Sequence, residues 1–282
     1  MRIFDKKTEF ITYSLIAVLT CACFIETPAQ DLSRFFKDNE GAFVLYDLNQ
    51  NRYIRYNEAR CRERFSPFST FKIPNSLIGL ETKVVKGADD VIRWEPQKFP
   101  SSAEWTTPPA VHWKQDHTLR SAIKYSVVWY YRDVARRIGE QRMKKYVDDF
   151  KYGNQDISGG LSSPELFECF WINSSLRISA DEQVEFLKKF YLGKLPVSQR
   201  SQQTVREILI LEKTPNYTLS AKTGGGSQSG QKALGWFVGY VETRGNVYFF
   251  ATNIDGPDAA AIRDKRITVT KEILKELGYL PE

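Results

Sequence analysis

The chain is poor in histidine, which limits the catalytic chemistry available to it. Only His112 and His117 occur in 282 residues, and both lie in the polar stretch HWKQDHT. A serine hydrolase with a histidine base would need one of them. Their polar surroundings predict surface positions for both histidines. A Ser/His/Asp triad is therefore the less favoured interpretation.

Long apolar runs are also scarce. The run ITYSLIAVLTCACF at residues 11–24 is too short to span a bilayer comfortably, and no later segment is long and apolar enough to do so. Arg2, Lys6 and Lys7 precede this run, and small residues follow it at 27–29. This arrangement is typical of an export signal covering residues 1–29, with the mature chain starting near Gln30. The sequence therefore predicts an exported, periplasmic protein without a membrane span.

Cysteine is rare in the expected mature chain. Cys21 and Cys23 fall in the signal, where lipidation of Cys23 is an open alternative, and only Cys61 and Cys169 remain. The spacing matches neither a metal-ligand set nor a redox CxxC motif. In an oxidising compartment the two cysteines could pair, or both could be buried free thiols. The sequence leaves these alternatives open.

The charge shows no strong bias towards one kind of partner. The net charge is +6, from 40 basic and 34 acidic residues that are interspersed along the chain. A protein that binds nucleic acid would show a basic cluster, and no long basic run occurs. The glycines at 224–226 lack both the dinucleotide spacing and a Gly-Lys-Ser/Thr ending, which excludes a nucleotide loop.

The two ends of the mature chain read as strands. The alternating stretches 42–46 and 53–56 flank a turn-rich segment, and 234–242 and 247–252 flank another. Each pair predicts a β-hairpin. A terminal helix follows, because Ile267, Thr270, Ile273, Leu274 and Leu277 recur at helical spacing.

The middle of the chain reads as helical. Thr118 can cap a short helix, Met143, Tyr146, Val147 and Phe150 have helical spacing, and Ser179 to Glu182 forms a capping box. Strands at both ends with helices between them predict an α+β fold. We expect one antiparallel sheet from the N- and C-terminal segments, with flanking helices and an inserted all-helical lobe. Residues 30–282 would form a single domain.

The stretch SPFSTFKIP at residues 66–74 sets a serine and a lysine among apolar side chains. Pro67 suits the first turn of a helix and Ser66 its cap, which places Ser69 in or near that turn. Ser69 and Lys72 would then share one helix face. Burial lowers the pKa of a lysine amine, and a neutral amine can take the proton of a serine hydroxyl. The alternative is a surface lysine beside an ordinary serine.

Two further stretches favour the catalytic interpretation. Lys222–Thr223–Gly224 stands just before a predicted strand, and such a lysine and threonine can bind a substrate carboxylate. Ser126 follows the helix that Thr118 caps and can supply a second hydroxyl. Penicillin-recognising serine enzymes combine S-x-x-K, S-D-N and K-T-G. Here the first and third elements stand in order, and the second is altered to Ser-Val-Val.

The sequence resembles the class D, or oxacillinase-type, β-lactamases from about Asp31 to Tyr279. The resemblance rests on ordered blocks: RFSPFSTFK at 64–72, KYSVV at 124–128, FKYGNQDIS at 150–158, FW at 170–171 with LRIS at 176–179, KTG at 222–224 and GWFVG at 235–239. The resemblance implies the fold of the serine β-lactamases and penicillin-binding transpeptidases.

The altered second element bears on the general base. Val128 stands where an S-D-N enzyme has a polar asparagine near the lysine. In the family that the chain resembles, a neutral lysine in an apolar pocket reacts with CO2 to form a carbamate. The resemblance implies this for Lys72, with Val128 in its surroundings and the indole N–H of Trp171 as a donor to the anion. It implies no metal and no separate cofactor other than CO2.

The resemblance also implies how a β-lactam is opened. Ser69 attacks the lactam carbonyl, and the backbone N–H groups of Ser69 and Gly225 form the oxyanion hole. Ser126 relays a proton to the leaving nitrogen with the help of Lys222. The base that acylates Ser69 then activates the water that hydrolyses the acyl-enzyme.

Thr223, Gly224 and an arginine are implied to hold the substrate carboxylate. Arg266 fits the family's arginine best, and Arg263 is the alternative. Gly225 departs from many relatives, which carry an aromatic residue directly after K-T-G. The sequence therefore leaves open which β-lactams are cleaved.

The expected function is hydrolysis of penicillin-type antibiotics, which confers resistance to them. One alternative is a β-lactam sensor or penicillin-binding domain that is acylated without turnover. Another is a peptidoglycan transpeptidase or carboxypeptidase, against which Val128 argues. The expected partners are β-lactams, not nucleic acid, and both a monomer and a homodimer are compatible with the sequence.

Overall fold

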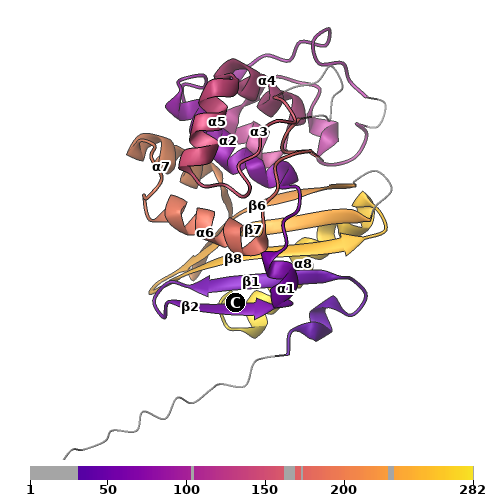
Figure 1. The fold of residues 1–282 in the computed structure, drawn as a ribbon, viewed down its shortest axis with the longest axis vertical. Coiled ribbons are helices and arrows are strands. Elements are labelled where there is room, and N and C mark those ends of the chain that lie inside the picture. Colours follow the sequence, from indigo (N-terminus) through magenta and orange to yellow (C-terminus); the bar gives the residue numbers. More distant parts are fainter. Residues whose placement is uncertain (1–30, 103–104, 162–168, 173, 228–231, 282) are drawn as a thin grey trace, which may run out of the picture. The chain divides into compact units, whose positions relative to one another are not determined.

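Segments from both ends of the chain pair in one antiparallel sheet, which confirms the predicted α+β class (Figure 1). The computed structural model describes residues 31–102, 105–161, 169–172, 174–227 and 232–281. The sheet has the strand order β2-β1-β8-β7-β6-β5, with bounds β1 Gly41–Asp47, β2 Arg52–Tyr56, β5 Ile210–Lys213, β6 Tyr217–Ser227, β7 Ala233–Thr243 and β8 Val247–Gly256. The two predicted hairpins are the pairs β1/β2 and β7/β8.

The stretch between the two sheet segments is largely helical, and Figure 1 shows α2 to α5 gathered beyond one end of the sheet. A two-stranded sheet, β3 Val91–Ile92 with β4 His117–Thr118, lies within this stretch. The α-helices are α1 Glu58–Arg62, α2 Lys72–Glu81, α3 Leu119–Lys124, α4 Val128–Ile138, α5 Glu140–Asp149, α6 Ala180–Tyr191, α7 Gln199–Ile208 and α8 Ala259–Glu276. The 3-10 helices are η1 Ser33–Phe36, η2 Phe68–Phe71 and η3 Ala110–His112.

The predicted helix caps are present. The Thr118 side chain accepts from the backbone N–H of Ser121, and the Ser121 side chain accepts from the backbone N–H of Thr118. Ser179 and Glu182 make the same reciprocal pair at the start of α6. Each pair satisfies two N–H groups that a helix leaves without an intrahelical partner.

Two hydrophobic cores lie on the two faces of the sheet, because side chains alternate along each strand. Phe43 and Leu45 of β1 belong to the core that α8 covers. Val44 and Tyr46 belong to the larger core on the opposite face, which continues into the helical stretch. The sheet is thus buried on both sides, and the active-site segments reach it from the larger core.

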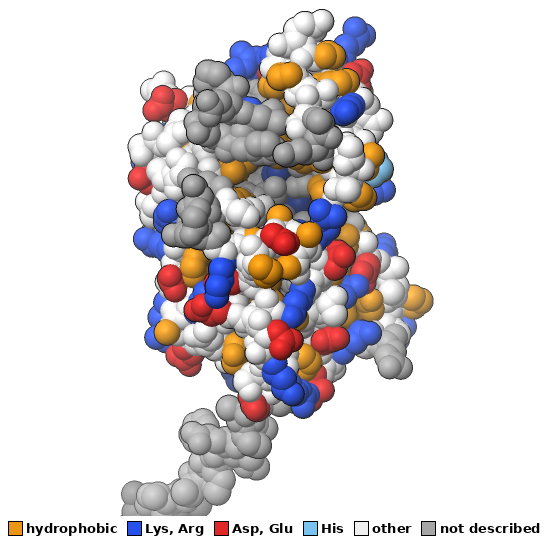
Figure 2. All heavy atoms as spheres, turned by 90° about the vertical axis from the view of Figure 1, so that its right-hand side faces the viewer, with side chains coloured by type: hydrophobic (Ala, Val, Ile, Leu, Met, Phe, Trp, Pro, Cys, Tyr) orange, Lys and Arg blue, Asp and Glu red, His pale blue; other side chains and the backbone are white. Residues whose placement is uncertain are grey.

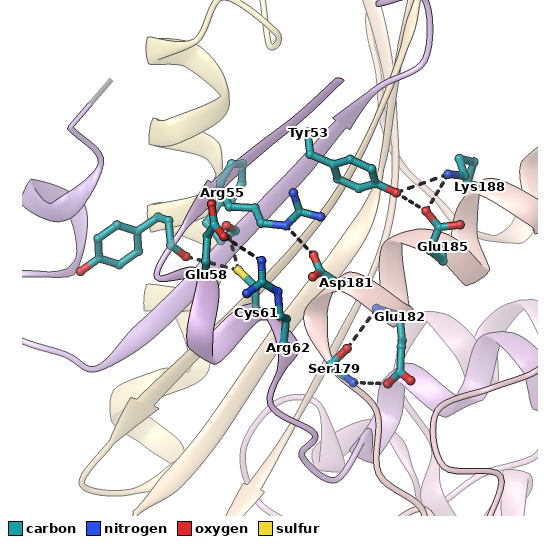
Figure 3. Close-up of polar contacts among 12 residues, drawn as sticks. Tyr53, Arg55, Glu58, Cys61, Arg62, Ser179, Asp181, Glu182, Glu185 and Lys188 are labelled. Atoms are coloured by element: carbon teal, nitrogen blue, oxygen red, sulfur yellow. Dashed lines mark hydrogen bonds and ion pairs between the residues drawn. The ribbon is translucent and has the colours of Figure 1, made fainter. Parts of the chain in front are cut away.

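A group of charged and phenolic side chains joins the outer strand β2 to helix α6, and we call it the β2–α6 seam (Figure 3). Arg55 Nε donates to Asp181 Oδ1 at 2.9 Å. The Tyr53 hydroxyl donates to Glu185, and Lys188 Nζ donates to Glu185 Oε1 at 2.6 Å. Burial, and then the Glu185 carboxylate, raise the pKa of Tyr53. Every cation of the seam has an acidic partner.

The two cysteines of the expected mature chain are buried free thiols, which resolves the open alternative. Cys61 Sγ donates to the carbonyl oxygens of Phe43 and Tyr56. Burial raises the pKa of Cys61 and of Cys169 to about 12. A thiol with so high a pKa is a poor nucleophile at neutral pH.

The expected export signal at 1–29, with Cys21 and Cys23, lies outside the described residues. Leu32–Glu282 form one compact unit. No helix in the described part of the chain is long and apolar enough to cross a membrane.

Candidate active site

Ser69 lies in the 3-10 helix η2, directly before α2 begins at Lys72. The prediction that Ser66 caps this helix is wrong. Ser66 Oγ donates to the Trp171 carbonyl at 3.2 Å, and Pro67 occupies the N-cap position without a side-chain cap. Phe68 has a left-handed backbone, with φ 48°, which is unfavourable for a bulky residue. Ser69 therefore sits on a strained turn held by long-range contacts.

The glycine run of β6 allows this turn to approach the sheet. A Cβ atom at Gly224 would lie 2.8 Å from the Pro67 carbonyl oxygen. A Cβ atom at Gly226 would lie 2.6 Å from the ring of Phe68. Such distances are shorter than van der Waals contact, so neither position admits a side chain without movement. The run thus serves backbone packing at Ser69 and not phosphate binding.

Lys72 is the centre of the site. Its Nζ donates to Ser69 Oγ at 2.6 Å, and the residue is 1 % exposed. Burial lowers the pKa of Lys72 to about 7. Among the described residues no carboxylate pairs with this amine; the nearest aromatic face is that of Tyr131, with its centroid 5.5 Å away. Ser69 Oγ therefore contacts an amine whose lowered pKa favours the neutral form.

Ser126 enters the site from the turn between α3 and α4. Its backbone is left-handed, with φ 52°. The turn is held from the outside, because Trp113 Nε1 donates to the Tyr125 carbonyl at 2.9 Å. Trp129 Nε1 in turn donates to the Trp113 carbonyl at 2.9 Å. The predicted second hydroxyl thus lines the same cleft as Ser69.

Lys222 and Thr223 lie on strand β6, as the sequence predicts. Lys222 is 5 % exposed, and its Nζ donates to the Thr223 carbonyl at 3.0 Å. Burial, and then the neighbouring Lys72 and Arg266, lower the pKa of Lys222 well below its ordinary value. Lys72 and Lys222 are therefore both buried, and in both the lowered pKa favours the neutral amine.

Arg266 reaches over β6 from helix α8. Its Nη1 donates to the Gly224 carbonyl, and a Cβ atom at Gly225 would lie 2.5 Å from this Nη1. Burial lowers the pKa of Arg266 to about 10. Arg263, the predicted alternative, also lines the cleft, one turn earlier on α8. The structure therefore brings both candidate arginines to the site, with only Arg266 bonded to β6 among the described contacts.

Ser69, Ser126, Thr223 and Arg266 line one cleft of about 640 Å³, whereas the buried Lys72 and Lys222 are not among its described lining residues. Figure 2 shows one face of the molecule, which has a hollow with basic and hydrophobic side chains in it. Residues from distant segments meet in its lining, among them Ser69, Pro108, Trp113, Ser126, Val128, Ile172, Thr223, Gly224, Gly225, Arg263 and Arg266. No described lining residue is acidic, and the described residues contain no cluster of His, Cys, Asp or Glu that could hold a metal ion.

The residues expected around Lys72 are apolar and buried. Val128 is the first residue of α4 and lines the cleft. Trp171 is 1 % exposed, and its indole stacks on the ring of Phe71 with centroids 5.5 Å apart. Phe71 directly precedes Lys72. Val128 and Trp171 thus come from separate segments, and their place around a carbamate on Lys72 stays a prediction.

Buried polar side chains support the turn from behind, and most of them carry no sequence motif. Thr70 Oγ1 donates to the Pro67 carbonyl at 2.8 Å, and Gln183 Nε2 donates to Thr70 Oγ1 at 2.8 Å. Tyr152, from the YGN block, donates to Gln183 Oε1 at 3.4 Å. The chain of contacts links α6 to the turn that carries Ser69.

A second support lies beneath Lys72. Ser76 Oγ donates to the Lys72 carbonyl at 2.7 Å and lies 2.8 Å from the Tyr131 hydroxyl. The Tyr131 ring faces Lys72 Nζ, so ring, hydroxyl and Ser76 form a closed loop around the lysine. Helical spacing would have indicated only that Ser76 and Tyr131 are buried.

The predicted surface position is wrong for His117, which is 1 % exposed. Its Nδ1 lies 2.9 Å from Ser121 Oγ and its Nε2 lies 2.9 Å from the His112 carbonyl oxygen. Burial lowers the pKa of His117. Pairing of β3 with β4 brings this side chain inside, which polarity along the sequence does not reveal. Neither histidine is among the described residues that line the cleft of Ser69.

Comparison with known sequences places this geometry in a family. Residues 37–277 match the family described as the penicillin binding protein transpeptidase domain. Over its full length the chain is 42 % identical to β-lactamase OXA-48 of Klebsiella pneumoniae, with all of that protein covered. It is 39 % identical to β-lactamase OXA-10 of Pseudomonas aeruginosa, over 96 % of this chain and 98 % of that one. It is also 35 % identical to the methicillin resistance mecR1 protein of Staphylococcus aureus, covering 88 % of this chain but 40 % of that protein.

Solved structures of class D β-lactamases are also similar to this chain. The class D β-lactamase YbXI from Nostoc superposes with a TM-score of 0.78 at 39 % identity, covering 89 % of this chain and 99 % of that one. FUS-1 (OXA-85), a class D β-lactamase from Fusobacterium nucleatum subsp. polymorphum, superposes with a TM-score of 0.79 at 36 % identity, covering 88 % and 98 %. This protein, in which Lys72 contacts Ser69 at the cleft, therefore belongs to the class D serine β-lactamases.

Proposed function

We propose that this enzyme hydrolyses the amide bond of penicillin-type β-lactams through an acyl-enzyme on Ser69, and so confers resistance to them. The observation that carries the proposal is the contact of 2.6 Å between Lys72 Nζ and Ser69 Oγ in a buried setting. A serine hydroxyl is a poor nucleophile unless a base takes its proton. Lys72 is the only described side chain bonded to Ser69 Oγ by a titratable group.

We propose further that Lys72 acts as an N-carboxylated lysine formed with CO2. Only a neutral amine reacts with CO2, and the pKa of about 7 leaves a large neutral fraction at neutral pH. Lys72 also has no acidic partner among the described residues, so no carboxylate would repel a negatively charged form of this side chain. Val128 and Trp171 would surround the group, with the indole N–H as donor. When formed, the group supplies a carboxylate base for acylation and deacylation.

The other residues act directly on the substrate in this proposal. The backbone N–H groups of Ser69 and Gly225 stabilise the oxyanion, and one such donor is worth about 10²–10³ in rate. Ser126, assisted by a neutral Lys222, passes a proton to the departing ring nitrogen. The nitrogen leaves as an amine while the acyl group stays on Ser69, and water then releases it as a carboxylate.

Thr223 and Arg266 hold the carboxylate of the drug, beside the backbone of Gly224. The support for Arg266 over Arg263 is its fixed position, since its Nη1 is bonded to the Gly224 carbonyl. An arginine so placed presents a preoriented cation to a carboxylate.

We propose that the protein works outside the cytoplasm, in the periplasm, after removal of residues 1–29. The support is the apolar run at 11–24 with basic residues before it and small residues after it. Both a monomer and a homodimer fit the proposed reaction.

The proposal is tested by hydrolysis of a chromogenic β-lactam by the mature protein, first in CO2-stripped buffer and then with bicarbonate restored. We expect turnover that fades without CO2 and returns with bicarbonate. Sustained turnover indifferent to CO2 would retain the β-lactamase and remove the carboxylated base. A single burst under both conditions would contradict hydrolysis altogether.

A second candidate is a β-lactam sensor that is acylated once. The observation that favours it is the likeness to the methicillin resistance mecR1 protein. Product counted per enzyme separates the two: a sensor releases about one equivalent and stays acylated on Ser69, whereas the proposed enzyme releases many. A cell-wall transpeptidase or carboxypeptidase would instead turn over a D-Ala-D-Ala peptide.

A further inference from the structure

The cleft contains more positive charge than one substrate carboxylate requires. Arg263 and Arg266 both line it, one helical turn apart on α8. Among the described residues that line the cleft there is no Asp or Glu to balance them. Thr223 and Arg266 suffice for the ring carboxylate in the proposed reaction. The proposed reaction therefore assigns no substrate group to Arg263.

The acidic residues near Arg263 on α8 are engaged or make no ion pair with it. Asp258 Oδ1 accepts from the backbone N–H of Ala261 and caps the helix. Burial has the largest effect on the pKa of Arg266 and lowers it. Asp264 raises this pKa, and Arg263 lowers it further. No ion pair joins Arg263 to a carboxylate within the described part of the chain, whereas Lys265 lies 3.7 Å from Asp38. Arg263 is therefore a second cation beside Arg266 that is available to a ligand.

The direction of α8 along β6 determines what Arg263 can reach. Ile267 and Ala221 line the same pocket, and Arg266 lies over Gly225. Ala259 lines the cleft together with Ser227, at the other end of the glycine run. Moving from Arg266 to Arg263 thus corresponds to moving along β6 from Thr223 towards Ser227. Arg263 is displaced from Thr223 and the ring carboxylate in that direction.

Penicillins carry their two substituents on opposite sides of the lactam carbonyl. The ring carboxylate is on one side, and the acylamino side chain is on the other. With the carboxylate at Thr223 and the carbonyl at Ser69 and Gly225, the side chain extends towards Ser227. Gly225, Gly226 and Ser227 line the cleft in that direction.

We infer that Arg263 binds a second anionic group on the acylamino side chain, so that the enzyme favours dianionic penicillins over monoanionic ones. This inference rests on the proposed function. A guanidinium and a carboxylate form a charge-assisted hydrogen bond, about twice as strong as a neutral one. The effect should weaken with ionic strength, because Arg263 is only partly buried.

The test compares two substrates that differ by one carboxyl group, benzylpenicillin and its α-carboxy analogue carbenicillin. For each enzyme form we would measure the ratio of kcat/KM for carbenicillin to that for benzylpenicillin. Arg263→Gln should lower this ratio about tenfold, the factor expected from one hydrogen bond to a charged group. Arg263→Lys should restore part of it, and Arg263→Glu should lower it further.

Lys265→Gln is the matched control, because it removes one positive charge from the same helix at a position paired with Asp38. It should leave the ratio unchanged. A ratio that is the same in Arg263→Gln as in the parent enzyme, while benzylpenicillin is still hydrolysed, would overturn the inference and leave the proposed function intact. An equal fall in the Lys265→Gln control would also overturn it, as a general charge effect. Failure of the parent enzyme to turn over either penicillin would instead contradict the proposed function.

Discussion

Two polar regions of this protein join the sheet to its helices, and they treat charge in opposite ways. In the β2–α6 seam, Arg55 is bonded to Asp181 and Lys188 to Glu185 (Figure 3). At the active site, the basic side chains of Lys72, Lys222 and Arg266 form what we call the cationic cluster. Their described hydrogen bonds go to hydroxyl and carbonyl oxygens, not to carboxylates.

The difference has a thermodynamic meaning. Removing a charge from water is costly unless it is paired, and an unpaired buried amine responds by losing its proton. The seam avoids this cost by pairing at half-buried positions. The cationic cluster bears it, and the result is a Lys72 amine with a pKa of about 7 beside the nucleophile. Unpaired burial thus costs stability at the site where the proposed chemistry needs a base.

The largest expected effect comes from deleting the base. Lys72→Ala should lower kcat for a chromogenic penicillin by about 10³-fold, since a general base contributes 10²–10⁴. Lys188→Ala removes a lysine from the seam and should change kcat at most twofold. Near-normal hydrolysis by Lys72→Ala, with the parent circular dichroism spectrum, would sink the proposed mechanism.

The next effect concerns the strained turn against β6. Gly224→Ala places a Cβ 2.8 Å from the Pro67 carbonyl oxygen and should displace Ser69, lowering kcat/KM about 10²-fold. Gly245→Ala is the matched control, because a Cβ there meets no atom within 4 Å. Equal activity of the two variants would show that the close packing of the turn is dispensable.

The cost of burying Lys72 is measurable as stability. An unfolded lysine has a pKa of about 10.4, so between pH 7 and 10 the unfolded state binds a proton that the folded state lacks. Stability should therefore rise with pH in this window. Lys72→Met should raise the unfolding free energy at pH 7 by about 2 kcal/mol in CO2-free urea titrations, with the advantage shrinking towards pH 10. A variant less stable than the parent at pH 7 would contradict the account of the cationic cluster.

The same lowered pKa predicts the acid limb of the activity profile. With bicarbonate in excess, kcat/KM should fall about tenfold from pH 8 to pH 6 as Lys72, with its pKa of about 7, becomes protonated. The loss should reverse on return to pH 8. A profile that is flat between pH 6 and 8 would mean that Lys72 does not titrate in this range.

The smallest effect is expected in the seam. A double-mutant cycle of Arg55→Ala and Asp181→Ala should give a coupling energy of about 0.5–1 kcal/mol in urea unfolding. Hydrolysis should change at most twofold in every variant of the cycle. A tenfold loss of kcat would show that the seam and the active site are energetically linked, which would contradict their treatment as independent regions.

Features that depend on near neighbours along the chain could be predicted from the sequence. The helix caps at Thr118 and Ser179 bond within three residues, and the strands of the two hairpins are local in sequence. Ser69 and Lys72 are three residues apart, so their contact could also be predicted from the spacing. Their contact of 2.6 Å follows from a single helical turn.

Features that depend on burial and on contacts between distant segments could not be predicted in this way. Ser66 bonds to Trp171, 105 positions away, and therefore does not cap its own helix. His117 lies inside although its sequence neighbours are polar. The pKa of Lys72 reflects desolvation by several segments at once, and the position of Arg266 over Gly225 reflects the packing of α8 on the sheet. Desolvation and shape are sums over the whole fold, which is why residue pattern alone indicates the site but not its state of charge.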